Sequence, residues 1–392
     1  MGFWNFKKEK KQEEIIEVNQ NELYSKFSTP FGIVGGADLA LPYVRAYGSE
    51  SFIRFGMDNL YPQLINQMYH TSALNSSIIQ YKSNAVIGGG FNIKSGDMSA
   101  MQKVREYSFI ERIGMEKMMR QLTKDLIMHG RITLLVDPTT KEVSLYRIGP
   151  EKVRNNEFKT IFTVSSDWSR SINMVEYPKY HPSLKCKSVY TYEIDGDAGD
   201  DIYPIPGYCT SLNDAFLQGQ MAYLQKNNII NSIYPSFVIK LAKKFGSEEE
   251  KMEFQKTVDS LKGAPAAGRV VAFVGQTIES LPTIESIDTK NNDKIFDSTI
   301  TRVATDICTA HQIDPLLMGI RVSGALGNGN ELAQQYVIFE KNVVMPLRKM
   351  MTEVGNKILE IGKVNSTIEI INYQIIDEQI INMTNNNNKQ LL

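Results

Sequence analysis

The spacing of apolar side chains predicts helices in the first part of the chain. Residues 58–86 place apolar side chains near the 3.6-residue period, and three glycines at 88–90 end this predicted helix. A second helix is expected from about Ser99 to His129, because the following Gly130 is a typical helix-terminating residue. The sequence therefore predicts two long helices before any strand.

After Gly130 the apolar pattern changes to the alternation expected of strands. Residues 131–148 contain two β-rich runs around the turn sequence DPTTK, which predicts a hairpin. Further strands are expected within 158–166 and 186–195. The acidic turn DGDAGDD at 195–201 lacks the spacing and the terminal glutamate of an EF-hand calcium loop. We therefore expect a strand-rich region without a metal site.

Two long helices are predicted later in the chain. The first spans about 211–232, with Thr210 or Ser211 as its N-cap, and would be roughly 30 Å long. The second runs from about Asn291 to His311. These helices bracket a compact insertion.

The insertion has the order strand, helix, strand. Its strands are expected at 234–243 and 268–280. The charged helix between them begins after Ser247, and Glu250 occupies the position that completes a capping box. Because open strand edges promote aggregation, we expect these edges to be paired or covered.

A glycine-dense loop, GIRVSGALGNGNE, occupies residues 319–331. Asp314-Pro315 stops the preceding helix, because proline has no amide hydrogen and disfavours helical geometry in the residue before it. The loop lacks the lysine of a phosphate-binding loop and follows a helix instead of a strand. Conformational freedom comes from Gly319, Gly324, Gly327 and Gly329. A mobile loop is favoured; a phosphate- or nucleotide-handling enzyme that uses residues 319–330 is the alternative.

Beyond the loop, apolar periodicity continues on both sides of Pro346. The pattern predicts one long helix, about 331–362, kinked at this proline. Two helices separated by a break are the alternative. Residues 366–376 then have the composition of a strand, and 378–392 that of a disordered tail.

The overall composition is that of an ordinary globular protein. Of 392 residues, 42% are hydrophobic and 22% charged, and the formal net charge of −1 gives no global argument for wrapping nucleic acid. Three widely spaced cysteines fit neither a disulfide framework nor a zinc cluster and favour a reducing compartment. No apolar run reaches the length of a membrane span, so we expect no membrane partner.

The sequence shows no catalytic constellation. The four histidines are scattered, without an H-E-x-x-H motif, and no G-x-S-x-G nucleophile motif occurs. His129 is better explained by the end of a helix than by acid–base chemistry. We therefore expect a protein that is not an enzyme and needs no metal or cofactor; a site assembled from distant residues is the remaining enzymatic possibility.

Residues 1–29 are polar and combine lysines with aromatic residues near the start. This segment is either a disordered tail or an arm that docks on a neighbouring subunit.

Five sequence segments occur in an order that resembles a known family. A helix ends in MHGRITLLVD, and VSLYRIGPEKVR closes the hairpin. Later come YCTSLNDAFLQGQMAYLQKNNIINS, then AHQIDPLLMGI, and after the glycine loop NELAQQYVIFEKNVVMPLRKMM. This order, over roughly 55–365, resembles the portal proteins of tailed bacteriophages, in the branch typified by siphophages. Departures are Asp314-Pro315 in place of a frequent double proline, and Met318 in place of a usual leucine.

The resemblance implies an α+β portal fold whose crown is reduced or absent, because little sequence follows Pro346. It divides the chain into an N-terminal arm (1–29), the N-terminal part of the wing (30–210), stem helix 1 (211–232), a β-α-β clip (233–288), stem helix 2 (289–313), a tunnel loop (314–330), a long kinked helix with the C-terminal part of the wing (331–377), and a disordered tail (378–392).

The function that the resemblance implies is that of a portal ring. Such a ring, usually of about twelve subunits, lies at one vertex of the capsid, within the major capsid protein. Double-stranded DNA passes through its channel during packaging and ejection, and the ring docks the terminase large subunit and the head–tail adaptor. The expected location is the virion, and the host cytoplasm during assembly.

The resemblance also implies roles for particular residues. The tunnel loop would present to DNA the residues Arg321, Val322, Ser323, Asn328 and Asn330; an intersubunit salt bridge is the alternative for the arginine. The stem would give the channel an acidic wall through Asp214, Asp297 and Asp306. The clip would contact adaptor or neighbouring subunits through Lys240, Lys243, Lys244, Glu248 and Glu249; a solvated charged surface is the alternative there.

Overall fold

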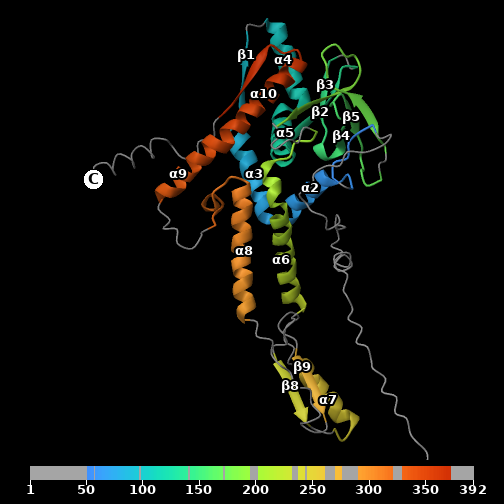
Figure 1. Cartoon of the computed structure of the whole chain (residues 1–392), viewed down its shortest axis with the longest axis vertical. Helices are drawn as coiled ribbons and strands as arrows, with labels where there is room; N and C mark the ends of the chain where they lie inside the picture. The colour runs from blue at the N-terminus through green and yellow to red at the C-terminus, as the bar shows by residue number, and fades with distance from the viewer. Residues whose placement is uncertain are drawn as a thin grey trace, which may run out of the picture.

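The computed structural model describes most of the chain between residues 51 and 371. The described ranges are 51–56, 58–96, 99–139, 142–170, 173–194, 202–231, 237–242, 245–260, 270–275, 290–320 and 329–371. Figure 1 shows a body of helices and small sheets, two long helices that leave it side by side, and a small unit at their far end. The expected mixture of helices and strands in an α+β chain is confirmed.

The first predicted helix is two helices, α2 (Tyr61–Thr71) and α3 (Ala73–Ile87). Ser72 between them has an extended backbone, and its hydroxyl accepts a hydrogen bond from the Asn75 amide at 3.1 Å. The prediction of a single helix was therefore wrong. The apolar period continues across Ser72, but a serine that caps a new helix turns the chain there.

The second predicted helix also divides in two, α4 (Ala100–Ile113) and α5 (Met115–His129). The prediction was right at both ends: Ser99 forms a capping box at the start, and Gly130 follows the last helical residue. It was wrong in the middle, because Gly114 has a left-handed backbone with φ 59° and interrupts the helix.

Gly130→Ala should lower the free energy of unfolding by about 2–4 kcal/mol. The left-handed φ of 67° disfavours any residue with a Cβ, and an added Cβ would lie 2.8 Å from the Ile194 side chain. Gly114→Ala is the matched control, since it has the same backbone strain but open space around the new Cβ. It should cost about 1–2 kcal/mol. Urea denaturation of both variants measures the difference in the free energy of unfolding. Equal losses would contradict the extra cost that we assign to the contact with Ile194.

Two three-stranded antiparallel sheets follow the helices. The first has the order β3-β2-β7 and consists of β2 (Arg131–Asp137), β3 (Ser144–Arg147) and β7 (Ser188–Glu193). The second has the order β4-β5-β6 and consists of β4 (Val153–Asn155), β5 (Ile161–Val164) and β6 (Val175–Pro178). The predicted hairpin and the strands at β5 and β7 are confirmed. β4 was missed because three residues are too few to show alternation, and β6 because it ends in a proline, which weakens the signal of a strand.

A further two-stranded sheet joins the segment after α3 to the last described strand. β1 (Phe91–Ser95) pairs antiparallel with β10 (Ser366–Ile370), so the strand expected in 366–376 is confirmed for its first five residues. Residues 372–392, which include the predicted tail, lie outside the described residues.

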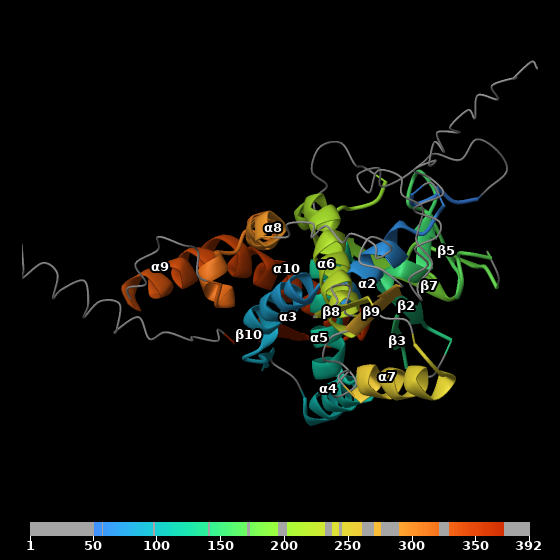
Figure 2. The same cartoon turned by 90° about the horizontal axis from the view of Figure 1, so that it is seen from below.

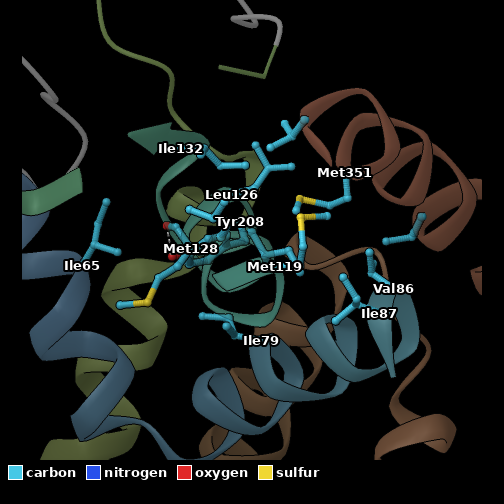
Figure 3. Packing of buried hydrophobic residues seen from close by; sticks show 14 of the residues in the cluster. Ile65, Ile79, Val86, Ile87, Met119, Leu126, Met128, Ile132, Tyr208 and Met351 are labelled. Carbon is cyan, nitrogen blue, oxygen red and sulfur yellow. Dashed lines mark hydrogen bonds between the residues drawn. The ribbon is translucent and has the colours of Figure 1, made fainter. Parts of the chain in front are cut away.

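The hydrophobic core gathers side chains from segments that are far apart in sequence. Figure 3 shows Ile79 and Val86 of α3 close to Met119 of α5 and Met351 of α10 (Met345–Ile361). All four are at most 1% exposed. Burial of each such side chain contributes about 1.5–3 kcal/mol, so this contact holds α10 against the N-terminal helices.

The two long helices and the insertion are α6 (Leu212–Asn231), β8 (Phe237–Ala242), α7 (Glu248–Ser260), β9 (Val270–Gly275) and α8 (Lys290–Ala310). β8 and β9 pair in parallel, which confirms the predicted β-α-β order. The Ser247 hydroxyl accepts from the Glu250 amide, as expected, whereas the Glu250 carboxylate accepts from the Gly246 amide.

The predicted N-cap of α6 was wrong. A 3₁₀ helix, Gly207–Ser211, runs directly into α6. The hydroxyls of Thr210 and Ser211 therefore donate to the carbonyl oxygens of Gly207 and Tyr208 and do not cap free amides.

The predicted long helix is present, with its irregularity just before Pro346. α9 (Gly329–Phe339) continues through a π-helical segment (Glu340–Val344) into α10 without a break. Proline lacks an amide hydrogen, and a wider turn ahead of it accommodates the missing bond. The guanidinium of Arg348 holds this segment against α3: it pairs with Glu340 at 2.7 Å and donates to the carbonyls of Ala85 and Val86.

Candidate functional site

The long helices α6 and α8 form an antiparallel pair that projects from the body (Figures 1 and 2). Near the body the pair is packed: Leu212 of α6 and Ile307 of α8 are at most 1% exposed. Farther along, Tyr223 and Leu224 of α6 are about half exposed. These two apolar side chains are therefore open to solvent in the isolated chain.

Two of the three acidic residues predicted for the stem meet around one arginine. Arg302 of α8 pairs with Asp306 at 2.7 Å and lies 3.8 Å from Asp214 of α6. Partial burial, and then the nearby Asp306, raise the pKa of Asp214, whereas Arg302 lowers it. Asp297 is exposed on α8. The acidic character at Asp214 and Asp306 is thus partly balanced by a cation that the sequence analysis did not include.

The glycine loop is fixed at both ends. Before it, the Asp314 carboxylate accepts from the Leu316 amide and caps a 3₁₀ helix, Pro315–Met318, which ends at Gly319 with a left-handed φ of 75°. After it, α9 begins at Gly329. The described residues before the loop are helical, whereas a phosphate-binding loop follows a strand.

Most of the predicted loop residues cannot be placed. Arg321, Val322, Ser323, Gly324, Gly327 and Asn328 lie outside the described residues, and the side chain of Asn330 does too. Their roles stay predictions.

The charged residues predicted for the clip are described only in part. Glu248 and Glu249 are exposed in the first turn of α7. Glu248 faces Lys251 at 3.5 Å on the same helix. Lys240 lies in β8, but its side chain is outside the described residues, as are Lys243 and Lys244.

The sequence analysis missed the buried charged groups of the body. Arg154 of β4 is fully buried and donates to the side-chain and main-chain oxygens of Asn59 at 2.7 and 2.6 Å. Arg131 of β2 pairs with Glu193 of β7 at 2.6 Å. Arg131 also donates to the Asn155 side chain of β4 at 2.6 Å, so it joins the two sheets, and Arg154 joins β4 to the segment before α2. A charged residue in a three-residue strand gives little signal of its burial.

A second missed pair joins α5 to the hairpin. Arg147 of β3 binds both carboxylate oxygens of Asp125 at 2.6 Å. Burial raises the pKa of Asp125 to about 6, against the lowering effect of this arginine. The signal was present in the sequence: Asp125 is spaced three residues from Leu122, on the apolar face of an amphipathic helix.

Metal binding and membrane crossing find no support among the described residues. In these ranges no three His, Cys, Asp or Glu side chains could together hold a metal ion. None of the described helices has the length and apolar character to cross a bilayer. His129 is buried, and its Nε2 lies 3.0 Å from the Asn66 side-chain oxygen, which is a packing role.

Comparison with known proteins relates this architecture to solved structures. No protein-family model and no curated protein matches the chain. Three similar solved chains come from the virion of a native gene transfer agent (GTA) particle (TM-score 0.56, 14% identity), the neck of an empty GTA particle with C6 symmetry (0.55, 13%), and the neck of a native GTA particle with C12 symmetry (0.54, 14%). Each match covers 80% of this chain and 84% of the other.

At this level of identity the similarity shows a shared fold. The chain has the fold of a protein from the neck, the head-to-tail connector structure, of a phage-like particle. The resemblance to portal proteins that the sequence indicated is confirmed at the level of the fold.

Proposed function

We propose that this chain is a portal-type connector subunit that forms a closed ring in the neck of a phage-like particle. The observation that carries the proposal is the fold similarity to GTA neck chains over 80% of this chain and 84% of theirs. Those necks are described with C6 and C12 symmetry, which supports a ring of about twelve subunits. The proposed location is the virion, after assembly in the host cytoplasm.

In this ring, α6 and α8 would form the stem and the β-α-β unit the clip. The clip lies at the far end of the stem, away from the body (Figure 1). A terminal position leaves it accessible to the terminase large subunit during packaging and to the head–tail adaptor afterwards. The body, as the wing, would contact the major capsid protein.

The glycine loop would line the DNA channel as the tunnel loop. A ring of twelve identical loops cannot match a duplex of about 10.5 base pairs per turn, so each loop must adapt to a different contact. Glycines allow this adaptation, and Arg321 and Asn328 would contact phosphates without reading bases. With one arginine per loop, DNA would be centred without being held firmly, because each phosphate contact adds to the salt-dependent affinity.

The purified chain should form a ring of twelve copies of the 44.3 kDa subunit, about 530 kDa. Light scattering measures the mass, and negative-stain images show the open centre.

Arg321→Ala should leave the ring intact and weaken the salt-dependent retention of double-stranded DNA. The matched control is Arg120→Ala, an exposed arginine paired with Glu116 on its own helix.

A small compact oligomer that binds a nucleotide, and loses it on Arg321→Ala, would overturn this proposal. That outcome would favour the enzymatic alternative, in which residues 319–330 handle a phosphate.

A further inference from the structure

A small cavity lies where the stem joins the body. It has a volume of about 230 Å³, and its walls come from α3, α5, the end of α8 and the helix around Pro346. Exposed residues such as Gln312 and Asn342 line its rim, so the cavity reaches the surface. In the sequence, α8 precedes the glycine loop and the helix around Pro346 follows it. The cavity wall thus includes the elements on both sides of the loop.

The cavity contains a buried cation that no described residue pairs with. Lys82 of α3 lines the cavity and is 8% exposed. Within the described ranges, no acceptor forms a hydrogen bond or an ion pair with its ammonium group. A buried ammonium group is costly unless it is paired, so this arrangement indicates an anionic ligand.

A second polar group in the wall is incompletely bonded. His311 lines the cavity, is fully buried and stacks on the Tyr208 ring at 4.5 Å. Its Nε2 lies 2.8 Å from Oδ1 of Asn75, whereas its Nδ1 and the Asn75 side-chain nitrogen have no partner. If the Asn75 amide is turned, it donates to Nε2, and Nδ1 then carries a hydrogen. With the Asn75 amide turned in this way, Nδ1 of His311 is a second donor in the cavity wall that contains Lys82.

The size and the lining of the cavity decide which anion fits. A volume of about 230 Å³ is below the usual range of about 300–1,000 Å³ for small-molecule sites, which excludes a nucleotide. Besides the polar groups, the walls are apolar and include Leu126, Val343 and Leu347. A phosphate has several hydrated oxygens that these walls cannot satisfy, whereas a carboxylate on a short apolar stem presents two oxygens to the two donors.

We propose that this cavity binds a carboxylate, supplied either by a free small molecule or by an acidic side chain of a second copy of the chain. The bound group would join α3 to the end of α8 and to the helix around Pro346, and so hold the two elements that flank the glycine loop. The free-ligand source does not require a ring; the second-copy source rests on the ring proposed above.

The test uses the full chain and sodium propionate, which resembles a glutamate side chain. At pH 7 and about ten times its Kd, propionate should raise the Tm of the isolated subunit by about 2 °C over matched sodium chloride. Lys82→Met should lose this rise, because it keeps the shape and removes the cation. The control Lys103→Met, at an exposed position of α4, should keep it. Sodium phosphate should give no comparable rise.

The same variants distinguish the two sources. If a second copy fills the cavity, propionate stabilises isolated subunits and not rings, and Lys82→Met reduces the ring fraction measured by light scattering. If the carboxylate is a free molecule, propionate stabilises both forms and ring formation is unchanged.

The proposal is overturned by a wild-type subunit that does not respond to propionate together with unchanged ring formation in Lys82→Met. A rise in Tm with phosphate as large as that with propionate would also overturn it, and so would a rise in Tm with propionate that Lys82→Met retains. Failure to form any ring would count against the proposed function alone, because the propionate test on isolated subunits does not depend on ring assembly.

Discussion

Lowering the pH from 7 to 5 should reduce the subunit's free energy of unfolding by about 4 kcal/mol through two buried histidines. Burial, with Arg147 and other arginines nearby, lowers the pKa of His129 to about 3. Burial and then Lys82 lower the pKa of His311 to about 2. Both therefore stay neutral in the folded chain at pH 5.

Stability falls as the pH falls, because each histidine has a pKa of about 6.5 in the unfolded chain. Below that pH the unfolded state binds a proton that the folded state does not bind. The stabilisation is therefore complete above pH 6.5 and is lost as the pH falls, by about 1.4 kcal/mol per pH unit for each histidine. Asp125 acts in the opposite direction, because its raised pKa of about 6 makes the folded state take up a proton first.

Urea denaturation at pH 7, 6 and 5 measures this loss. His129→Gln and His311→Gln should each remove about half of the roughly 4 kcal/mol that the two histidines contribute, and Asp125→Asn should steepen the net pH dependence. His181→Gln is the control, because that histidine is exposed. An unchanged pH dependence in the double variant of His129 and His311 would show that these side chains are not buried and neutral.

Arg154→Met should reduce the free energy of unfolding by about 3–5 kcal/mol, because several buried acceptors each lose their donor at a cost of about 1–3 kcal/mol. Besides its two bonds to Asn59, the guanidinium donates to the carbonyls of Glu151 and Val153 at 3.1 and 3.0 Å. It also lies 4.8 Å from the centre of the Trp168 ring. Methionine fills much of the space but leaves these buried oxygens without a donor, which is the costly part.

The matched control for this prediction is Arg120→Met. Arg120 is half exposed and pairs along its own helix with Glu116, so its loss should change stability by less than about 1 kcal/mol. Urea denaturation at pH 7 compares the two variants. If Arg154→Met lowers the free energy of unfolding no more than Arg120→Met does, the hydrogen bonds of Arg154 make no net contribution to stability.

Elements set by local signals were predictable from the sequence. The end of α5 follows from Gly130, and the hairpin of β2 and β3 from alternation around a turn. The β-α-β insertion was read from its apolar runs and from Ser247 at the start of α7. In each case the residues that decide the structure lie within a few positions of the structure they form.

The breaks at Ser72 and Gly114 were missed for a different reason. Apolar spacing continues across both positions, and either residue can also occupy the middle of a helix. Whether the chain turns there depends on what the two helical segments can pack against, which periodicity does not contain.

Of the candidate site, the sequence indicated the stem acids but not their partner. Arg302 is close to Asp306 in sequence, but its approach to Asp214 depends on how α8 lies against α6. The loop residues around Arg321 stay predictions, since they lie outside the described residues.

By itself, the sequence determined the hairpin after Gly130, the β-α-β insertion between two long helices, the helix around Pro346 and the resemblance to a family of ring-forming proteins. Only the tertiary structure decided that β1 pairs with β10, and that Lys82, without an ion pair among the described residues, lies in a cavity with His311. The physical reason is that strand pairing and burial are properties of two surfaces. A residue's own neighbours in sequence specify one surface, and the fold brings the other from hundreds of residues away.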